Sequence, residues 1–148
     1  MHPIGFVRSP HHDTAQIPKG CGAKHEVTGI LDILPEYEQG LHDIEGFSHL
    51  FVLWVFDRTE GYELMVSPPT DTTPHGLFAT RAPCRPNPIG LTVVKLLKRE
   101  GAQLHVHGVD MLDGTPILDL KPYLSSVAPE QLRRGWLEEA EARKGRRG

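Results

Sequence analysis

The most strongly β-forming segment of the chain is FSHLFVLWVF, residues 47–56. It is dense in aromatic and β-branched residues and almost continuously hydrophobic, which is typical of a central strand buried on both faces. On either side of it, we expect further short strands at 4–8, 25–34 (one strand or a pair), 62–69, 77–80, 89–99, 102–109 and 115–120. Glycine and proline are spread along the chain and supply the turns between these segments.

Two segments have helical spacing instead. Residues 35–45 begin with a proline and place Tyr37, Leu41 and Ile44 at helical intervals, so we predict one short helix there. Residues 129–142 predict a C-terminal helix with Leu132, Trp136, Leu137 and Ala140 on one side. The predicted fold is mostly β: a small closed antiparallel β-barrel of about seven short strands with a short helix and a C-terminal helix. Closure is favoured because it removes exposed strand edges.

Length and composition fit one globular domain. The chain has 148 residues, of which 39% are hydrophobic and 24% charged. We expect a β-barrel domain at 1–128, followed at 129–148 by a helix and basic tail with no separate C-terminal domain. No apolar run approaches the roughly 20 residues that cross a bilayer, and no secretory signal is visible, so we expect a cytoplasmic protein with no membrane partner.

Charge is unevenly distributed along the chain. Residues 131–148 hold six Arg or Lys and three Glu and contribute +3, so the remainder contributes −6 to the net charge of −3. The tail ARKGRRG is suited to a polyanion or to plain solvation. The two cysteines, Cys21 and Cys84, form no CxxC pair, which argues against a disulfide framework and a cysteine-rich zinc site. We expect no metal.

Several common enzyme motifs are missing from the sequence. It contains no GxGxxG, GxxxxGK[ST] or GxSxG, which removes support for a Rossmann cofactor site, a P-loop NTPase and an α/β-hydrolase. Any catalytic or binding site must therefore be formed by segments that match none of these motifs.

One such segment is FATRAPCRPNPIGL, residues 78–91. Three prolines stiffen it around Arg81, Arg85 and Asn87, and a stiff loop presents polar groups with little entropy lost on binding. Two guanidinium groups and an amide held in this way suit an anionic or heteroaromatic ligand. The alternative is a proline-rich corner whose arginines bond nearby carbonyls.

A second segment is GVDMLDGTPILDLKPY, residues 108–123, with a turn at Asp113-Gly114. Asp119 lies inside the apolar run ILDL, where a carboxylate is costly unless paired. Either it pairs with Lys121 or an arginine, or it helps to line a site formed with the 81–87 loop.

Together with FSHLFVLWVF at 47–56, IGFVRSP at 4–10 and the prolines at 68–69, these strings resemble the TsaA-like, or TrmO-type, family. The resemblance extends over nearly residues 3–125. It implies an S-adenosylmethionine-dependent methyltransferase built on a small β-barrel, forming a homodimer with the cofactor near the subunit boundary. It further implies tRNA as the substrate, with methylation of the exocyclic nitrogen of threonylcarbamoyl-adenosine next to the anticodon.

The resemblance also implies roles for individual residues. Its motif positions assign cofactor binding to Ile17, Pro18, Lys19, Gly20, Phe56, Asp57, Arg58, Arg81, Leu91, Thr115, Pro116, Ile117 and Leu118. They assign substrate binding to Arg85, Lys121 and Tyr123, and catalysis to Asp119, Asp57 and Asn87. On this hypothesis Arg81 pairs with the methionine carboxylate of the cofactor, and Asp119 or Asp57 orients the acceptor nitrogen or takes its proton.

The sequence departs from the family pattern in three places. Residues 70–76, TDTTPHG, are acidic where better-known members are basic and glycine-rich, Asp57 stands where many members have histidine, and no additional C-terminal domain follows the barrel. The acidic stretch favours the alternative of a methyltransferase for a small-molecule acceptor. A non-catalytic S-adenosylmethionine-binding module is the third hypothesis.

Overall fold

The strand predicted from residues 47–56 lies at the centre of the sheet. In the computed structural model, which describes residues 1–13, 17, 25–69 and 71–147, it is β3 (His49–Val55). Leu50, Val52 and Trp54 point into the core, whereas the residues between them are half-buried. The expectation that both faces are fully buried was therefore wrong, because only the inner face of β3 meets the barrel core.

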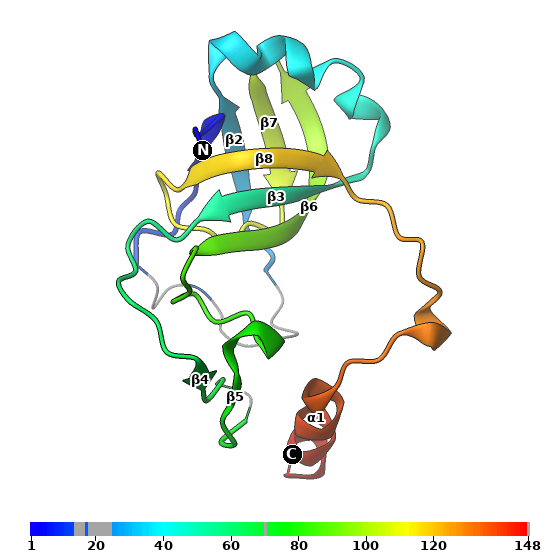
Figure 1. Cartoon of the computed structure of the whole chain (residues 1–148). Helices are drawn as coiled ribbons and strands as arrows, with labels where there is room; N and C mark the ends of the chain where they lie inside the picture. The colour runs from blue at the N-terminus through cyan, green and yellow to red at the C-terminus, as the bar shows by residue number, and fades with distance from the viewer. Residues whose placement is uncertain (14–16, 18–24, 70, 148) are drawn as a thin grey trace.

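Six strands close into an antiparallel barrel (Figure 1). The order around it is β1 (Gly5–Arg8), β2 (Thr28–Ile33), β7 (Gln103–His107), β6 (Ile89–Glu100), β3 and β8 (Pro116–Pro122). Pairing of Gly5 with Ile117 joins β8 back to β1. The prediction of a small closed antiparallel barrel is confirmed, with six strands in the barrel where about seven were expected.

The core fills the inside of this barrel. Alternate residues of each strand point inward, as the period of two requires. The buried cluster includes Val7, Leu31, Ile33, Leu50, Val52, Trp54, Val94, Leu104, Val106, Met111 and Ile117.

The indole of Trp54 is accommodated by the absence of a side chain on the neighbouring strand. Gly90 of β6 is paired with Trp54 in the register, and a methyl group on Gly90 would overlap the indole ring. Glycine is needed at this position because the indole ring of Trp54 approaches the backbone of Gly90 closely.

The end of the barrel drawn uppermost in Figure 1 is capped by two 3-10 helices, η2 (Pro35–Leu41) and η3 (Ile44–Gly46). A single helix over 35–45 was expected. Asp43 adopts a left-handed conformation with φ 71° and interrupts the run between the two.

The segment between β3 and β6 lies beyond the opposite end of the barrel, which we call the lower end (Figure 1). It contains a small separate sheet of β4 (Met65–Val66) and β5 (His75–Gly76), followed by the 3-10 helix η4 (Leu77–Ala79). The predicted strand over 62–69 is thus reduced to two residues. The predicted strand at 77–80 is wrong, because the backbone N–H of Thr80 bonds the carbonyl of Leu77 and closes a helical turn.

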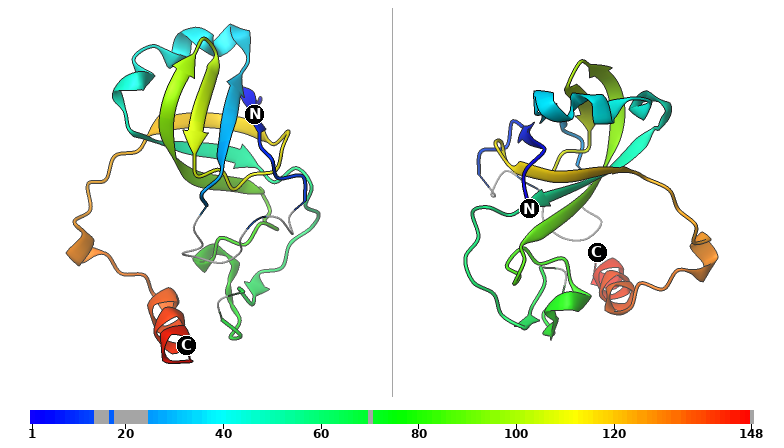
Figure 2. Two further views of the ribbon diagram at one scale, coloured as in Figure 1. Left: turned by 180° about the vertical axis from the view of Figure 1, so that it is seen from behind. Right: turned by 45° about the horizontal axis from the view of Figure 1, so that its top comes forward.

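The C-terminal part of the chain leaves the barrel after β8 and returns to its lower end, as both views of Figure 2 show. It forms the 3-10 helix η5 (Pro129–Gln131) and the α-helix α1 (Trp136–Arg147). The helix predicted over 129–142 therefore starts later. Gly135, with φ 58°, separates the two helices and leaves Leu132 half exposed outside α1. Across the described residues, no helix is long and apolar enough to span a bilayer.

Candidate cofactor and substrate site

The end of β3 joins the two segments that the sequence singled out. The backbone N–H of Phe56 donates to the carbonyl of Pro88 at 2.8 Å, next to Asn87 of the proline-rich loop. Two residues on, Nη2 of Arg58 donates to the carbonyl of Asp113 at 2.8 Å. The 83–88 loop and the 113–114 turn are therefore both attached to residues 56–58, at the lower end of the barrel.

The aspartate turn is held rigidly against the first strand. Oδ1 of Asp113 accepts the backbone N–H of Ser9 at 3.0 Å, and the N–H of Asp113 donates to the carbonyl of the buried His11 at 2.8 Å. The N–H of Gly114 donates to Val7, and its φ of 82° makes glycine the suitable residue in this turn. The backbone entering β8 is consequently fixed before any ligand binds.

Residues 115–118 continue from this turn into β8. Thr115 is buried, and its hydroxyl donates to the carbonyl of Leu112 at 2.6 Å. Ile117 lies in the core, whereas Pro116 and Leu118 are half-buried. The hydroxyl of Thr115 thus stabilises its own turn. What this stretch presents outward is backbone and two partly exposed apolar side chains.

The proline-rich loop is shaped by one of its own arginines. Nη1 of Arg85 donates to the carbonyls of Thr80 and Ala82, both at 3.0 Å, and its guanidinium lies 5.8 Å from the centre of the Phe78 ring. Arg81 and Asn87 are exposed. The two arginines therefore differ: Arg85 bonds nearby carbonyls, while Arg81 lies at the protein surface.

A second group of predicted residues lies on the outer face of the barrel. Leu91 and Asp119 flank Leu53 in the register, one on each neighbouring strand, which puts their backbones about 10 Å apart. Oδ1 of Asp119 accepts the N–H of Leu120, and Oδ2 lies 3.9 Å from Nζ of Lys121. Tyr123 packs edge-on against Phe51 and is 44% exposed.

Three of the predicted cofactor residues lie outside the part of the chain that the structure describes: Pro18, Lys19 and Gly20. Ile17 is described and half-buried, and Asp57 is exposed. Among the described residues, no three His, Cys, Asp or Glu side chains converge as a metal centre would require.

The sequence did not reveal a series of polar side-chain contacts that begins in the barrel core and leads to the lower end of the barrel. Nε1 of Trp54 donates to Oγ1 of Thr92 at 3.0 Å, and the Thr92 hydroxyl donates to Oδ1 of Asp110 at 2.7 Å. Oδ2 of Asp110 lies 4.0 Å from Nε2 of His25. A hydroxyl at an inward position of an otherwise apolar strand was the available signal.

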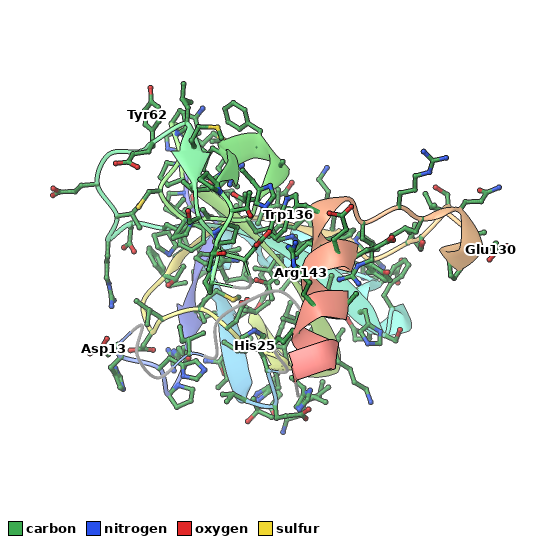
Figure 3. The ribbon with its side chains drawn as sticks, turned by 90° about the horizontal axis from the view of Figure 1, so that it is seen from below. Asp13, His25, Tyr62, Glu130, Trp136 and Arg143 are labelled. Atoms are coloured by element: carbon green, nitrogen blue, oxygen red, sulfur yellow. The ribbon has the colours of Figure 1, made fainter. Side chains whose placement is uncertain are left out.

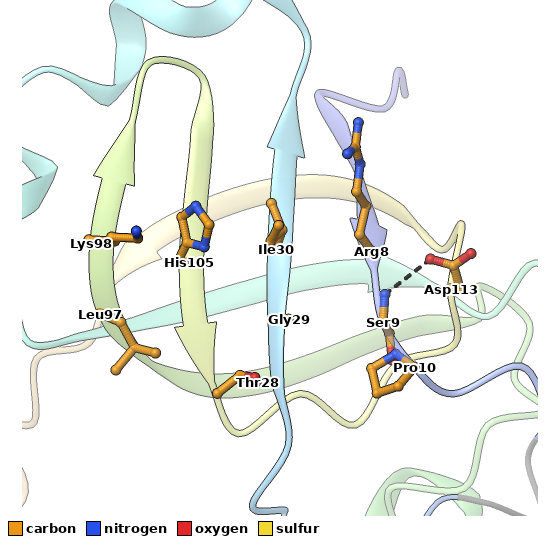
Figure 4. A pocket seen from close by; sticks show the side chains of 10 residues that line it. All are labelled: Arg8, Ser9, Pro10, Thr28, Gly29, Ile30, Leu97, Lys98, His105 and Asp113. Carbon is orange, nitrogen blue, oxygen red and sulfur yellow. Dashed lines mark hydrogen bonds between the residues drawn. The ribbon is translucent and has the colours of Figure 1, made fainter.

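Two surface grooves accompany these residues. One, of about 720 Å³, runs over the outside of β1, β2, β7 and β6, where Arg8, Ile30, His105 and Lys98 form one row (Figure 4). Its cations are already paired, Arg8 with Asp32 and Lys98 with Glu100. The other, of about 630 Å³, lies between η2 and β8 and includes Asp119 and Lys121. Asp113 of the aspartate turn lines the end of the first groove, whereas the 83–88 loop lines neither.

Comparisons with known proteins place this geometry in a family. The model of the tRNA-methyltransferase O N-terminal domain matches residues 6–128. A probable S-adenosyl-L-methionine-binding protein of Pyrococcus abyssi is 44% identical over 137 residues, covering 92% of this chain and 74% of that protein. The tRNA (adenine(37)-N6)-methyltransferase of Escherichia coli is 37% identical over 131 residues, covering 82% and 56%.

A solved structure agrees with the sequence comparisons. The crystal structure of TrmO superposes with a TM-score of 0.74 at 37% identity, over 91% of this chain and 62% of that one. The chain thus spans little more than half of these two methyltransferase relatives. With the closed barrel, the two motif segments and the family match in agreement, the chain belongs to the TrmO N-terminal domain family.

Proposed function

We propose that this chain is an S-adenosylmethionine-dependent methyltransferase that acts on the N6 nitrogen of adenine 37 of tRNA, and that the modified base is threonylcarbamoyl-adenosine. The observation that carries the proposal is the joining of the 83–88 loop and the 113–114 turn by residues 56–58. It is supported by relatives named for S-adenosylmethionine binding and for tRNA methylation. On this proposal the protein works in the cytoplasm, where its substrate is found.

The residues at the lower end have the donor and acceptor types that this cofactor requires. Exposed guanidinium groups of Arg81 and Arg58 suit a carboxylate, and the exposed carboxylate of Asp57 suits ribose hydroxyls or an amino group. The half-buried Pro116 and Leu118 supply apolar contact beside a fixed backbone. When bound, S-adenosylmethionine supplies the methyl group and a sulfonium leaving group.

The chain's own contribution is alignment and removal of a proton. Fixed loops align the acceptor nitrogen with the methyl carbon, and alignment alone lowers a barrier by several kcal/mol. We propose that Asp57, rather than Asp119, accepts the proton that leaves the acceptor nitrogen. Asp119 already accepts the N–H of Leu120 and faces Lys121. Asn87 precedes Pro88, whose carbonyl is bonded by Phe56 at the end of β3. On this proposal Asn87 orients the acceptor nitrogen.

We further propose a homodimer formed through the outer face of β3 and β6. Ile89, Leu91, Val93 and Tyr123 are 38–44% exposed there, and Phe51 lies between Val93 and Lys121 in the register. A contiguous apolar face of this kind indicates a protein contact. Leu91, a predicted cofactor residue, then lies at the boundary between subunits.

The alternative of a small-molecule acceptor rested on the acidic 70–76 stretch. Its carboxylate, Asp71, is only 6% exposed and is bonded by His75 and Arg143. The stretch therefore presents little negative charge to an approaching polyanion, which favours the tRNA substrate over the small acceptor.

The test is incubation of the purified protein with methyl-labelled S-adenosylmethionine and two tRNA preparations, one carrying threonylcarbamoyl-adenosine and one lacking it. We expect one methyl group, detected by nucleoside mass spectrometry, only on the first. Methylation of both would remove the threonylcarbamoyl specificity. Cofactor binding by calorimetry with no methyl transfer to either would instead favour a binding module.

A further inference from the structure

The helix α1 is anchored to the loop after β4 by a cluster of four side chains. The indole of Trp136 stacks on the imidazole of His75, with centroids 4.2 Å apart and planes 13° apart, and its Nε1 donates to the carbonyl of Ala79 at 2.9 Å. About two turns further along the helix, Nη2 of Arg143 lies 3.2 Å from Oδ2 of Asp71. We call Asp71, His75, Trp136 and Arg143 the helix clamp.

The clamp is internally satisfied. Nε2 of His75 lies 2.9 Å from the same Oδ2 of Asp71, and Oδ1 accepts the backbone N–H of Thr73 at 3.2 Å. Ala140, between the two ends of the contact, is 2% exposed. A helix that only trailed in solvent would not bury an alanine and a carboxylate against a distant loop.

The clamp fixes where the positive charge of the chain lies. The excess of +3 in residues 131–148 is attached to a body that carries −6. Within α1 the acidic residues Glu138, Glu139 and Glu141 occupy the first half, and Arg143, Lys144, Arg146 and Arg147 follow them. Figures 1 and 3 show α1 passing beneath the lower end of the barrel, the end with the candidate site.

An exposed aromatic ring lies next to this helix. Phe78 is 75% exposed although it is in an ordered 3-10 helix, and it directly precedes Ala79, the acceptor of the Trp136 bond. The guanidinium of Arg85 lies over its ring. Exposed aromatic rings beside a basic element are typical of surfaces that stack unpaired bases and contact the phosphate backbone.

We propose that the clamped helix α1 and Phe78 together form the RNA-binding surface of this protein, with Lys144 of α1 contacting a phosphate and Phe78 stacking on an unpaired base. This inference rests on the proposed tRNA substrate. It adds an RNA-contacting element outside the barrel to the predicted substrate-binding residues.

The test measures the affinity of the full chain for an unmodified tRNA transcript by fluorescence anisotropy between 50 and 200 mM KCl. Lys144→Ala is compared with Lys98→Ala, since each removes one exposed lysine and Lys98 lies on the outside of the barrel. We expect Lys144→Ala to weaken binding about threefold and reduce the salt slope by about 0.7–0.9, the value of one phosphate contact. Lys98→Ala leaves both unchanged.

Two further pairs separate position from charge. Trp136→Ala releases the helix without changing any charge and is expected to weaken RNA binding, whereas Trp136→Phe keeps the stack on His75 and weakens it less. Phe78→Ala is expected to reduce affinity about tenfold, with Phe78→Tyr close to wild type. Circular dichroism and the melting temperature verify that each variant keeps the barrel.

The outcomes are distinguishable from failure of the proposed function. If the wild-type chain binds and methylates tRNA while the Lys144, Trp136 and Phe78 variants behave like it, this inference is overturned and the proposed function stands. If the wild-type chain binds S-adenosylmethionine but no tRNA, both are overturned. Equal losses for Lys144→Ala and Lys98→Ala would also overturn it, because they would show charge attraction without a defined surface.

Discussion

Trp54 and Thr92 are joined inside the barrel by a hydrogen bond of 3.0 Å, from the indole Nε1 to the threonine hydroxyl. The same hydroxyl donates to Asp110, which follows β7 at the lower end. One buried side chain therefore connects β3 and β6 to the segment that carries the aspartate turn.

Replacing this hydroxyl by a methyl group should destabilise the protein. Thr92→Val keeps the shape and the strand preference but leaves the indole N–H and an oxygen of Asp110 without their partner, a cost of about 1–3 kcal/mol. Urea unfolding measures the loss. The exposed Thr28 of β2 offers the control Thr28→Val, for which we expect almost no change; an equal loss in both would contradict the role of the buried bond.

The contact between Gly90 and Trp54 makes a second prediction about stability. In Gly90→Ala the added methyl group overlaps the indole, and overpacking of this kind costs about 1–3 kcal/mol. For a chain of this size that lowers the melting temperature by about 2–4 °C per kcal/mol. Gly46→Ala is the control, because its methyl group meets no atom within 4 Å. A Gly90→Ala melting temperature at or above that of wild type would contradict the packing argument.

The helix clamp should respond to acid. The hydrogen bond from His75, followed by the Thr73 N–H and Arg143, lowers the pKa of Asp71 below its ordinary value of 3.8. A carboxyl group with a lowered pKa contributes stability that is complete above its ordinary pKa and is lost as the pH falls through the lowered value. In a Trp54→Phe background, quenching of Trp136 by iodide should stay low from pH 7 to 5 and rise only below about 4.

The control for this titration is Asp71→Asn. Without the carboxyl group, quenching of Trp136 should be raised already at pH 7 and should lose the rise that the wild-type protein shows in acid. A wild-type step near pH 6 instead would assign the response to a histidine and contradict the role given to Asp71.

Arg81 should matter for cofactor affinity. On the proposed function its guanidinium pairs with the methionine carboxylate, and a charge-assisted bond of this kind contributes about 1.5–3 kcal/mol. We expect Arg81→Ala to weaken binding of S-adenosylmethionine at least tenfold by calorimetry. Arg133→Ala removes another exposed arginine and should leave the affinity unchanged. Unchanged affinity in Arg81→Ala would remove the role assigned to this residue.

The proposed homodimer predicts a position-dependent effect on β6. Val93→Asp places a charge in the apolar outer face shared with β3, and light scattering should show a shift from dimer to monomer. Leu97→Asp is the control, since Leu97 is 49% exposed on the same strand but lines the groove of Figure 4. A wild-type protein that is monomeric at micromolar concentration would contradict the proposal directly.

The barrel was predictable because its strands carry their own pattern. Alternation of Leu104 and Val106 with polar neighbours and the dense apolar run of β3 indicate strands with no knowledge of the rest of the chain. Where the prediction failed, local backbone bonding decided the outcome. Residues 77–80 have strand-forming side chains, yet the carbonyl of Leu77 accepts both the N–H and the hydroxyl of Thr80 and closes a turn.

The site was predictable only in part, because it is built from contacts between distant segments. The motif strings identified the 83–88 loop and the 113–114 turn, but nothing in them indicates that residues 56–58 bond both. The contacts of the helix clamp could not be predicted from the sequence at all. Trp136 was expected on the apolar side of a helix, and no local pattern pairs it with His75, which lies far away in the sequence.

Residues 123–135, which connect β8 to α1, determine how strong the clamp must be. A short connection keeps the two segments that it joins at an effective concentration in the millimolar range. Contacts with an intrinsic affinity of about 1 mM, or about 4 kcal/mol, are then enough to leave the helix seated roughly half the time. A substitution that raises the intrinsic dissociation constant of the clamp above about 1 mM would leave the helix unseated most of the time, while the closed barrel would retain its own stability.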